Sequence, residues 1–158
     1  MKLDQIDLKI LKNLQENARI TNADLAERVG LSPTPCLRRL RRLETEGIIK
    51  GYHTEINRDA LGINVTVITL VKLEREDDTT LRDFEAAIKK RPEVMECYLV
   101  TGKFDYFIRV VIPTLAAYDT FLSEAILRRP NVIVESIVTL REVERKIVTP
   151  LPPGAFKA

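Results

Sequence analysis

The sequence predicts an α+β protein with a helical N-terminal domain and a C-terminal domain built from two strand-helix-strand units. Apolar residues recur at helical spacing through the first third of the chain. Farther on, a constant offset of 38 residues relates the segment that begins at Arg91-Pro92 to the one that begins at Arg129-Pro130, which indicates an internal repeat. We expect four regions: a helical domain at 1–51, a linker at 52–63, a sheet domain at 64–145 and a C-terminal tail at 146–158.

Two helices are expected before residue 31. Residues 4–16 carry apolar side chains on one stripe, the pattern of a helix that packs on one side. A shorter helix follows Thr21, which fits a capping box: its hydroxyl can accept from the backbone N–H of Asp24, whose carboxylate reaches back. Gly30 can adopt the left-handed conformation that ends this second helix.

A third helix is expected to begin at Leu31-Ser32-Pro33-Thr34-Pro35. Ser32 suits the N-cap and Pro33 the first helical position, where no amide hydrogen bond is lost. An apolar stripe of Cys36, Leu37, Leu40 and Leu43 faces inward. Two short helices joined by a tight turn, with a second helix that is basic on its outer face, describe a helix-turn-helix.

The basic charge of the chain is concentrated on this third helix. Residues 1–58 hold eleven Lys and Arg against eight Asp and Glu, whereas residues 59–158 hold fourteen against fifteen. We therefore predict a double-stranded DNA partner, contacted by Ser32, Thr34, Pro35, Arg38, Arg39, Arg41 and Arg42. Arg38 and Arg42 lie opposite the leucine stripe and are expected to reach base edges, while Arg39 and Arg41 mainly contact phosphates.

Residues 48–56 alternate like an extended segment, and two interpretations stay open. Lys50-Gly51 either marks the turn of a small wing beside the DNA or belongs to a strand that pairs with a partner subunit. One histidine, His53, and two distant cysteines predict no metal site and no disulfide; Cys36 and Cys97 are expected to be buried. We find no signal peptide and no apolar run near the ~20 residues of a membrane span, so we expect a cytoplasmic protein without a membrane partner.

Each unit of the repeat begins with an expected strand, at residues 64–73 and 104–112. The helices that follow are striped by Leu81, Phe84 and Ile88 and by Leu115, Tyr118, Leu122 and Ala125. This βαββαβ order is the ferredoxin-like split βαβ, in which both helices cover one face of the sheet. Since the strands are apolar on both sides, the uncovered face predicts at least a dimer.

The connection between the two units reads Thr101-Gly102-Lys103-Phe104-Asp105-Tyr106. The simplest interpretation is structural: a glycine makes a tight turn before a strand, and Asp105 satisfies turn amides.

The chain resembles the Lrp/AsnC family, the leucine-responsive or feast/famine transcriptional regulators, over residues 2–150. The matching motifs are Leu3-Asp4-x-x-Asp7-x-x-Ile10-Leu11, Leu31-Ser32-Pro33-Thr34-Pro35-Cys36 followed by Arg38 and Arg39, Leu43-Glu44-x-x-Gly47-Ile48-Ile49, and Thr101-Gly102-x-x-Asp105-Tyr106. The resemblance implies a winged-helix-like DNA-binding domain, a linker strand and a ferredoxin-like domain that binds amino acids. It also implies dimers that assemble into tetramers or octamers.

The resemblance gives the hairpin a second interpretation, as an effector site between dimers. The effector-binding candidates are Thr101, Gly102, Lys103, Phe104, Asp105, Tyr106 and, on the facing strand, Thr139. A free amino acid needs donors for its carboxylate and acceptors for its ammonium group, and a hairpin with an aspartate offers both. Leucine or a methionine-like amino acid is the first guess, and no cofactor is expected.

Two other functions have to be weighed. Sirohaem decarboxylase subunits resemble this family in fold. Their haem chemistry is expected to require histidine side chains, and this chain has only His53, so we do not expect an enzyme. A DNA-organising protein without an effector is compatible with the sequence.

Overall fold

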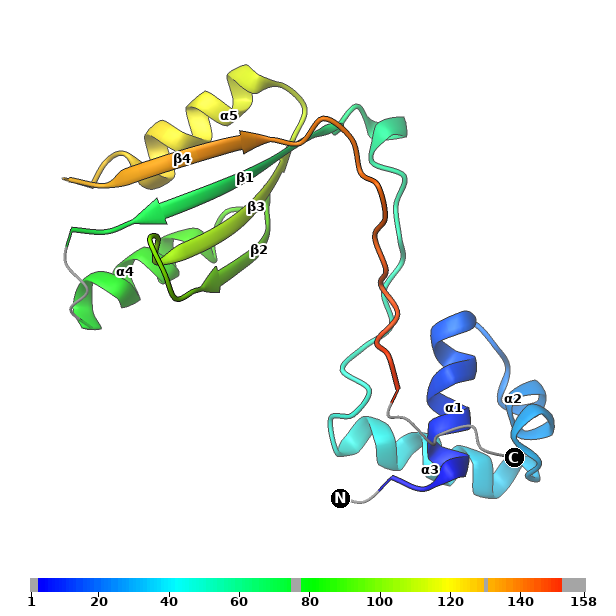
Figure 1. The fold of residues 1–158 in the computed structure, drawn as a ribbon. Coiled ribbons are helices and arrows are strands. Elements are labelled where there is room, and N and C mark those ends of the chain that lie inside the picture. Colours follow the sequence, from blue (N-terminus) through cyan, green and yellow to red (C-terminus); the bar gives the residue numbers. More distant parts are fainter. Residues whose placement is uncertain (1–2, 75–77, 130, 152–158) are drawn as a thin grey trace. The chain divides into compact units, whose positions relative to one another are not determined.

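A computed structural model describes residues 3–74, 78–129 and 131–151, and the chain divides into two compact units (Figure 1). The helical unit combines Met1–Glu55 with Glu144–Ala158, and the sheet unit is Ile56–Val143. Within the described part of the chain, no helix is long and apolar enough to cross a membrane.

Three helices form the helical unit: α1 (Gln5–Glu16), α2 (Asn22–Val29) and α3 (Pro33–Thr45). Their apolar stripes meet in one core, which contains Leu8, Ile10, Leu11, Leu25, Ala26, Val29, Cys36 and Leu43. The burial of Cys36 was predicted. Leu151 also packs against this core, although it lies in the segment expected to be a tail. The helical unit is therefore built from both ends of the chain.

The caps of these helices only partly follow the predictions. Thr21 Oγ1 accepts from the Asp24 backbone N–H at 3.2 Å, but the Asp24 carboxylate accepts from the Thr21 hydroxyl and not from its backbone N–H. Ser32 occupies the N-cap of α3 without a side-chain capping bond. An N-cap side chain bonds the N–H of the second or third helical residue, and Pro35 in the third position has none. Gly30, at φ 73°, ends α2 as expected.

The linker contains no wing hairpin. Residues 50–57 adopt no regular secondary structure, so Lys50-Gly51 does not mark a strand turn within one chain. The Tyr52 hydroxyl donates to a Glu44 carboxylate oxygen at 2.8 Å, which ties the start of this segment to α3. Pairing with a partner subunit stays a prediction.

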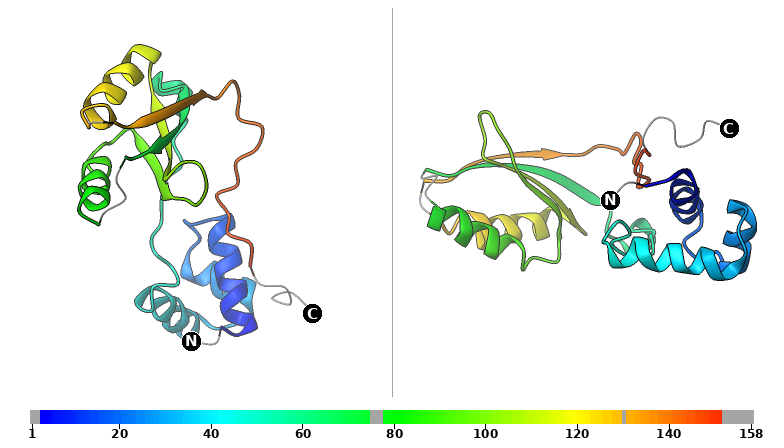
Figure 2. Two further views of the ribbon diagram at one scale, coloured as in Figure 1. Left: turned by 60° about the vertical axis from the view of Figure 1, so that its left-hand side comes forward. Right: turned by 90° about the horizontal axis from the view of Figure 1, so that it is seen from below.

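The sheet unit has the predicted βαββαβ order. After a 3₁₀ turn (Asp59–Leu61) its elements are β1 (Val65–Lys72), α4 (Asp78–Ile88), β2 (Val94–Leu99), β3 (Tyr106–Ile112), α5 (Leu115–Phe121) and β4 (Ile133–Val138). The strands pair antiparallel in the order β2-β3-β1-β4. Both helices lie on one side of this sheet, as the view from below shows (Figure 2). The predicted fold class is confirmed.

The core between helices and sheet differs from the prediction at one end of α5. Phe84, Ile88, Tyr118 and Ala125 are buried as expected, but Leu115 is 55% exposed, and the sequence analysis missed the buried Phe121 and Ile126. A π-helical turn at Leu122–Ile126 follows α5 directly. Because a π-helical turn contains more residues than an α-helical turn, it changes which residues face the sheet, and Ile126 enters the core.

Edge strand β2 also corrects a prediction, because Cys97 is exposed and not buried. It lies on the outermost strand of the sheet, where no further strand covers it. The alternating pattern predicts burial only for a strand that has a neighbouring strand on each side, and an edge strand has a neighbour on one side only.

A chain of hydroxyl groups, buried at Thr69 and Tyr118 and exposed at Ser136, joins α5 to the sheet. The Tyr118 hydroxyl lies 2.9 Å from Thr69 Oγ1 and 2.6 Å from Ser136 Oγ. Thr69 is fully buried, so removing the tyrosine hydroxyl leaves its oxygen without a partner.

Tyr118→Phe should therefore lower the free energy of unfolding by about 1–3 kcal/mol. Urea denaturation followed by circular dichroism measures this loss. Thr69→Val with Tyr118→Phe should cost less than the two single changes added together, because the two groups share one bond. Strict additivity would contradict the bonded chain.

Candidate DNA-binding and effector sites

The turn between α2 and α3 is closed by the local sequence. Leu31 donates its N–H to the Ala26 carbonyl at 2.8 Å across the left-handed Gly30. Asn22 Nδ2 then donates to the Pro33 carbonyl at 2.9 Å, which joins the first turns of the two helices. These bonds set the start of α3 beside α2, the arrangement of a helix-turn-helix.

The seven predicted DNA-binding residues all belong to α3 and its N-cap, but they are not equally accessible. Ser32, Thr34, Arg38, Arg41 and Arg42 are exposed, whereas Pro35 and Arg39 are partly buried. Neither Arg38 nor Arg41 has an ion-pair partner among the described residues.

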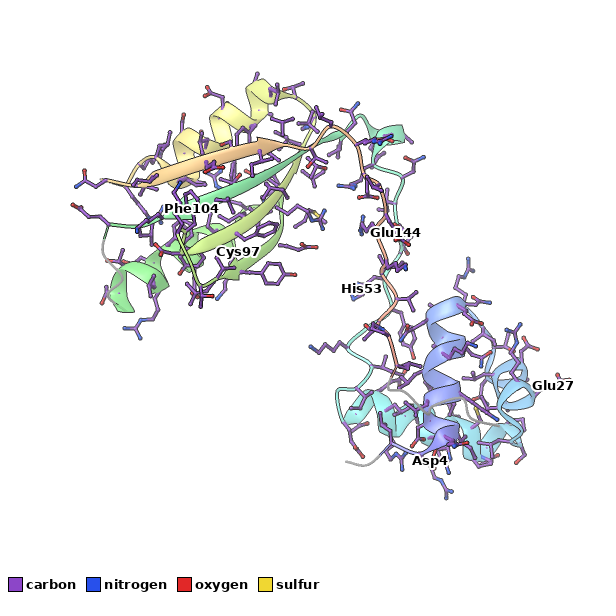
Figure 3. The ribbon with its side chains drawn as sticks, in the orientation of Figure 1. Asp4, Glu27, His53, Cys97, Phe104 and Glu144 are labelled. Carbon is purple, nitrogen blue, oxygen red and sulfur yellow. The ribbon has the colours of Figure 1, made fainter. Side chains whose placement is uncertain are left out.

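Arg39 and Arg42 are ion-paired with the start of α1, which the sequence analysis missed. Asp7 is only 1% exposed, and its carboxylate accepts from Arg39 Nη1 at 2.9 Å and from Arg42 Nη2 at 2.6 Å. Arg39 Nη1 also donates to the Asp4 carboxylate. Figure 3 shows Asp4 at the end of α1 that lies against α3.

Asp4 and Asp7 also form a complete capping box on α1. The Asp7 N–H donates to Asp4 Oδ1 at 2.8 Å, and the Asp4 N–H donates to Asp7 Oδ2 at 3.1 Å. The bond from the Asp7 backbone, together with the Arg39 guanidinium, holds the pKa of the Asp4 carboxyl below its ordinary value. The same contacts with Asp4 and Asp7 raise the pKa of Arg39. We name Asp4, Asp7, Arg39 and Arg42 the carboxylate clamp.

In the sheet unit, the candidate effector hairpin joins β2 to β3. Gly102 has φ 123°, a conformation that favours glycine. Asp105 was expected to accept from amides of its own turn. Its carboxylate instead accepts from the Leu73 N–H at 2.7 Å, just beyond the end of β1. The hairpin backbone is held as well, because the Asp105 N–H donates to the Val71 carbonyl at 2.9 Å.

The side chains of the hairpin divide into an exposed and a buried group. Thr101, Gly102 and Lys103 are exposed, and Lys103 Nζ lies 5.0 Å from the centre of the partly buried Phe104 ring. Figure 3 labels Phe104 near the end of the sheet. Tyr106 by contrast lies in the core, 1% exposed, and offers no ring surface to a ligand at the hairpin.

Tyr106 instead lines a small cavity under α4. Its hydroxyl donates to Glu85 Oε1 at 3.3 Å, and burial followed by the Glu85 charge raises its pKa to about 12. The cavity holds about 170 Å³ and is also lined by Ile88, Lys89, Cys97 and Leu99. Among the described residues, no cluster of His, Cys, Asp and Glu could hold a metal ion.

Thr139 does not lie near the hairpin of its own chain. Its N–H donates to the Thr66 carbonyl at 2.9 Å, at the start of β1, whereas the hairpin bonds the end of β1 at Val71 and Leu73. The offset of 38 residues equates Thr139 with Thr101, but β4 runs antiparallel to β1 and β2 runs parallel to it. The corresponding ends of β2 and β4 therefore lie at opposite ends of the sheet.

Comparison with known proteins matches one family model to the three helices and another mainly to the sheet unit. Residues 3–50 match a family model for winged helix-turn-helix DNA-binding domains, and residues 66–148 match the model for the Lrp/AsnC ligand binding domain. The leucine-responsive regulatory protein of Salmonella typhimurium is 42% identical over 144 residues, 90% of this chain and 88% of that protein. The chain belongs to the Lrp/AsnC family.

Solved structures of Lrp/AsnC regulators share this fold along nearly the whole chain. A transcriptional regulator of Neisseria meningitidis in complex with L-Met superposes with a TM-score of 0.88 at 35% identity, covering 94% of this chain and 97% of that one. An AsnC family regulator of Agrobacterium tumefaciens gives 0.86 at 34% identity, covering 95% and 97%.

These comparisons confirm the predicted family and the predicted function. The chain is a DNA-binding transcriptional regulator of the Lrp/AsnC type with an amino-acid-binding domain, and its relatives are regulators and not enzymes. The carboxylate clamp is an arrangement of the helical unit that the motifs did not predict. Leu3-Asp4-x-x-Asp7 stood out in the sequence, but nothing in it pairs Asp7 with arginines 32 and 35 positions away.

Proposed function

We propose that this Lrp/AsnC regulator binds double-stranded DNA as a symmetric homo-oligomer and responds to a free apolar amino acid at subunit interfaces. The observation that carries the proposal is the pairing of an exposed basic helix in one unit with a sheet unit of the amino-acid-binding type. We further propose that it works in the cytoplasm, where its DNA lies.

Arg38 and Arg41 supply the principal DNA contacts. Both are exposed on α3, and neither has an ion-pair partner among the described residues. Arg38 reads base edges in the major groove and Arg41 binds phosphate, while Ser32, Thr34 and Pro35 lie at the helix N-terminus beside the backbone.

Arg38→Ala should cost about 1–3 kcal/mol on a preferred site and relax base preference, because a base-edge contact discriminates between sequences. Arg41→Ala should weaken all sequences alike. Selection of binding sites from a random duplex library, followed by fluorescence anisotropy on the selected duplex and a random duplex, separates the two effects. Equal losses on both duplexes for Arg38→Ala would contradict base reading.

The uncovered face of the sheet supports assembly. It presents Ile68, Leu70, Tyr98, Phe107, Ile133 and Ile137, and Tyr98 and Phe107 have ring centres 6.1 Å apart. Tyr98 is 55% and Ile133 59% exposed. Burying such a face against a second copy is favourable, and a two-fold dimer presents two copies of α3 to a roughly palindromic site.

The full chain should therefore be at least a dimer at micromolar concentration in light scattering. Phe107→Glu should shift it toward monomer, because it replaces an aromatic ring of this face by a charge in the row that already contains Glu135. Thr120→Glu, on the exposed side of α5, is the matched control and should leave the assembly intact. A wild-type monomer would rule out this interface.

The hairpin and its surroundings suit a zwitterionic ligand at a subunit interface. Thr101, Gly102 and Lys103 leave backbone groups and a cation exposed, Asp105 adds an acid and Phe104 adds apolar surface. Thr139 can join them only from another subunit, since it lies at the opposite end of its own sheet. The regulator of Neisseria meningitidis was solved with L-Met, so methionine and leucine are the first ligands to test.

Gly102→Val should abolish the amino-acid response and preserve basal DNA binding. The strain comes from the backbone, because φ 123° disfavours a β-branched residue, while the space beside Gly102 is open within one chain. Calorimetry with methionine, leucine and the other amino acids at millimolar concentration measures binding to wild type and variant. Absence of heat with every amino acid would leave an effector-independent DNA-organising protein.

A further inference from the structure

Among the described residues of the helical unit, the carboxylate clamp contains the most deeply buried charge. Asp7 is 1% exposed, whereas its partners Arg39 and Arg42 have side chains that are 26% and 42% exposed. A buried carboxylate is strongly disfavoured unless it is paired and hydrogen-bonded. Both oxygens of Asp7 satisfy this requirement, through one arginine each and, for Oδ2, the Asp4 N–H.

Ion pairing, and not spacing alone, separates the four arginines into two pairs. Arg39 and Arg42 are three residues apart and so lie on one side of α3, the side that contacts the start of α1. Arg38 and Arg41 are also three apart. Arg38 lies one turn from Arg42 on the exposed side of α3, but neither Arg38 nor Arg41 forms an ion pair among the described residues.

The formal charges favour different roles for the pair Arg39 and Arg42 and the pair Arg38 and Arg41. The carboxylate clamp holds two arginines and two aspartates, so its formal charge is zero. A DNA phosphate that took either arginine away would leave the Asp7 carboxylate buried and less compensated, which opposes the exchange. Arg38 and Arg41 can bind DNA without breaking an ion pair to any described residue.

We propose that Asp7 is a positioning residue for DNA binding. Its buried carboxylate keeps Arg39 and Arg42 in ion pairs that join α1 to α3, so these two arginines do not bind DNA. Base recognition and phosphate binding then depend on Arg38 and Arg41. This assignment revises the sequence-based expectation that Arg42 reads bases and Arg39 contacts phosphates. It rests on the proposed DNA binding by α3.

The salt dependence of binding to a random 30-base-pair duplex tests the proposal. Each phosphate contact contributes about 0.9 to the slope of log affinity against log salt, which is about 3.5-fold between 50 and 200 mM. Arg41→Gln should reduce the slope by this amount. Arg42→Gln should leave the slope unchanged and lower the unfolding temperature, because it removes a brace and not a DNA contact.

Asp7→Asn provides the decisive comparison. It releases two guanidinium groups, so the slope should become steeper and affinity for random DNA should rise, while the unfolding temperature falls. Glu16→Gln removes the same charge from an exposed site at the far end of α1 and should change neither quantity beyond the general charge effect. Asp7→Asn combined with Arg42→Gln should return the slope toward that of the wild type.

Several outcomes would overturn the proposal. A slope that falls for Arg42→Gln as much as for Arg41→Gln would make Arg42 a DNA contact. A slope for Asp7→Asn that matches Glu16→Gln would reduce Asp7 to a stabilising residue. If Asp7→Asn does not fold, Arg39→Gln and Arg42→Gln still test the withheld contacts. Failure of the wild-type chain to bind any duplex would reject the proposed function itself.

Discussion

The need to compensate one buried carboxylate determines how the helices of the DNA-binding unit meet. Asp7 lies in the first turn of α1, where it completes the cap of its own helix and accepts from two arginines of α3. Because these bonds are directional and the group is buried, α3 cannot rotate on α1 without exposing an unpaired charge. The outer face of α3, with Arg38 and Arg41, is therefore fixed by contacts on its inner side.

The sheet unit is subject to a different constraint, that of a sheet covered on one face. Both helices pack over Val67, Thr69 and Val71 of β1, whereas Ile68 and Leu70 face the other way. The first face is buried by the two helices of the same chain, whereas the second face stays exposed within one chain and is the surface proposed for assembly. The proposed oligomerisation and the proposed DNA reading thus use separate surfaces on separate units.

The sequence predicted the order of elements well, because periodicity and turn residues act locally. It failed where the outcome depends on contacts between distant residues. Asp7 looked like any acid of a first helical turn, and its burial follows only from the packing of α3. Thr139 was assigned to the hairpin from the family resemblance, as a residue of a facing strand, but within one chain strand direction separates it from the hairpin, and direction is set by pairing across the sheet. Tyr106 fits an apolar ligand site by type, yet the core beneath α4 already uses its ring.

The position of Leu151 has a consequence for how the protein is made. This residue packs into the core of the helical unit, but it follows the whole sheet unit in the chain. During translation the three helices are synthesised first, but the contact between their core and Leu151 cannot form until residue 151 has been added. The DNA-binding unit is thus completed only after the sheet unit has been translated, and a chain that terminates between the end of the sheet unit and Leu151 lacks a core contact of the helical unit alone.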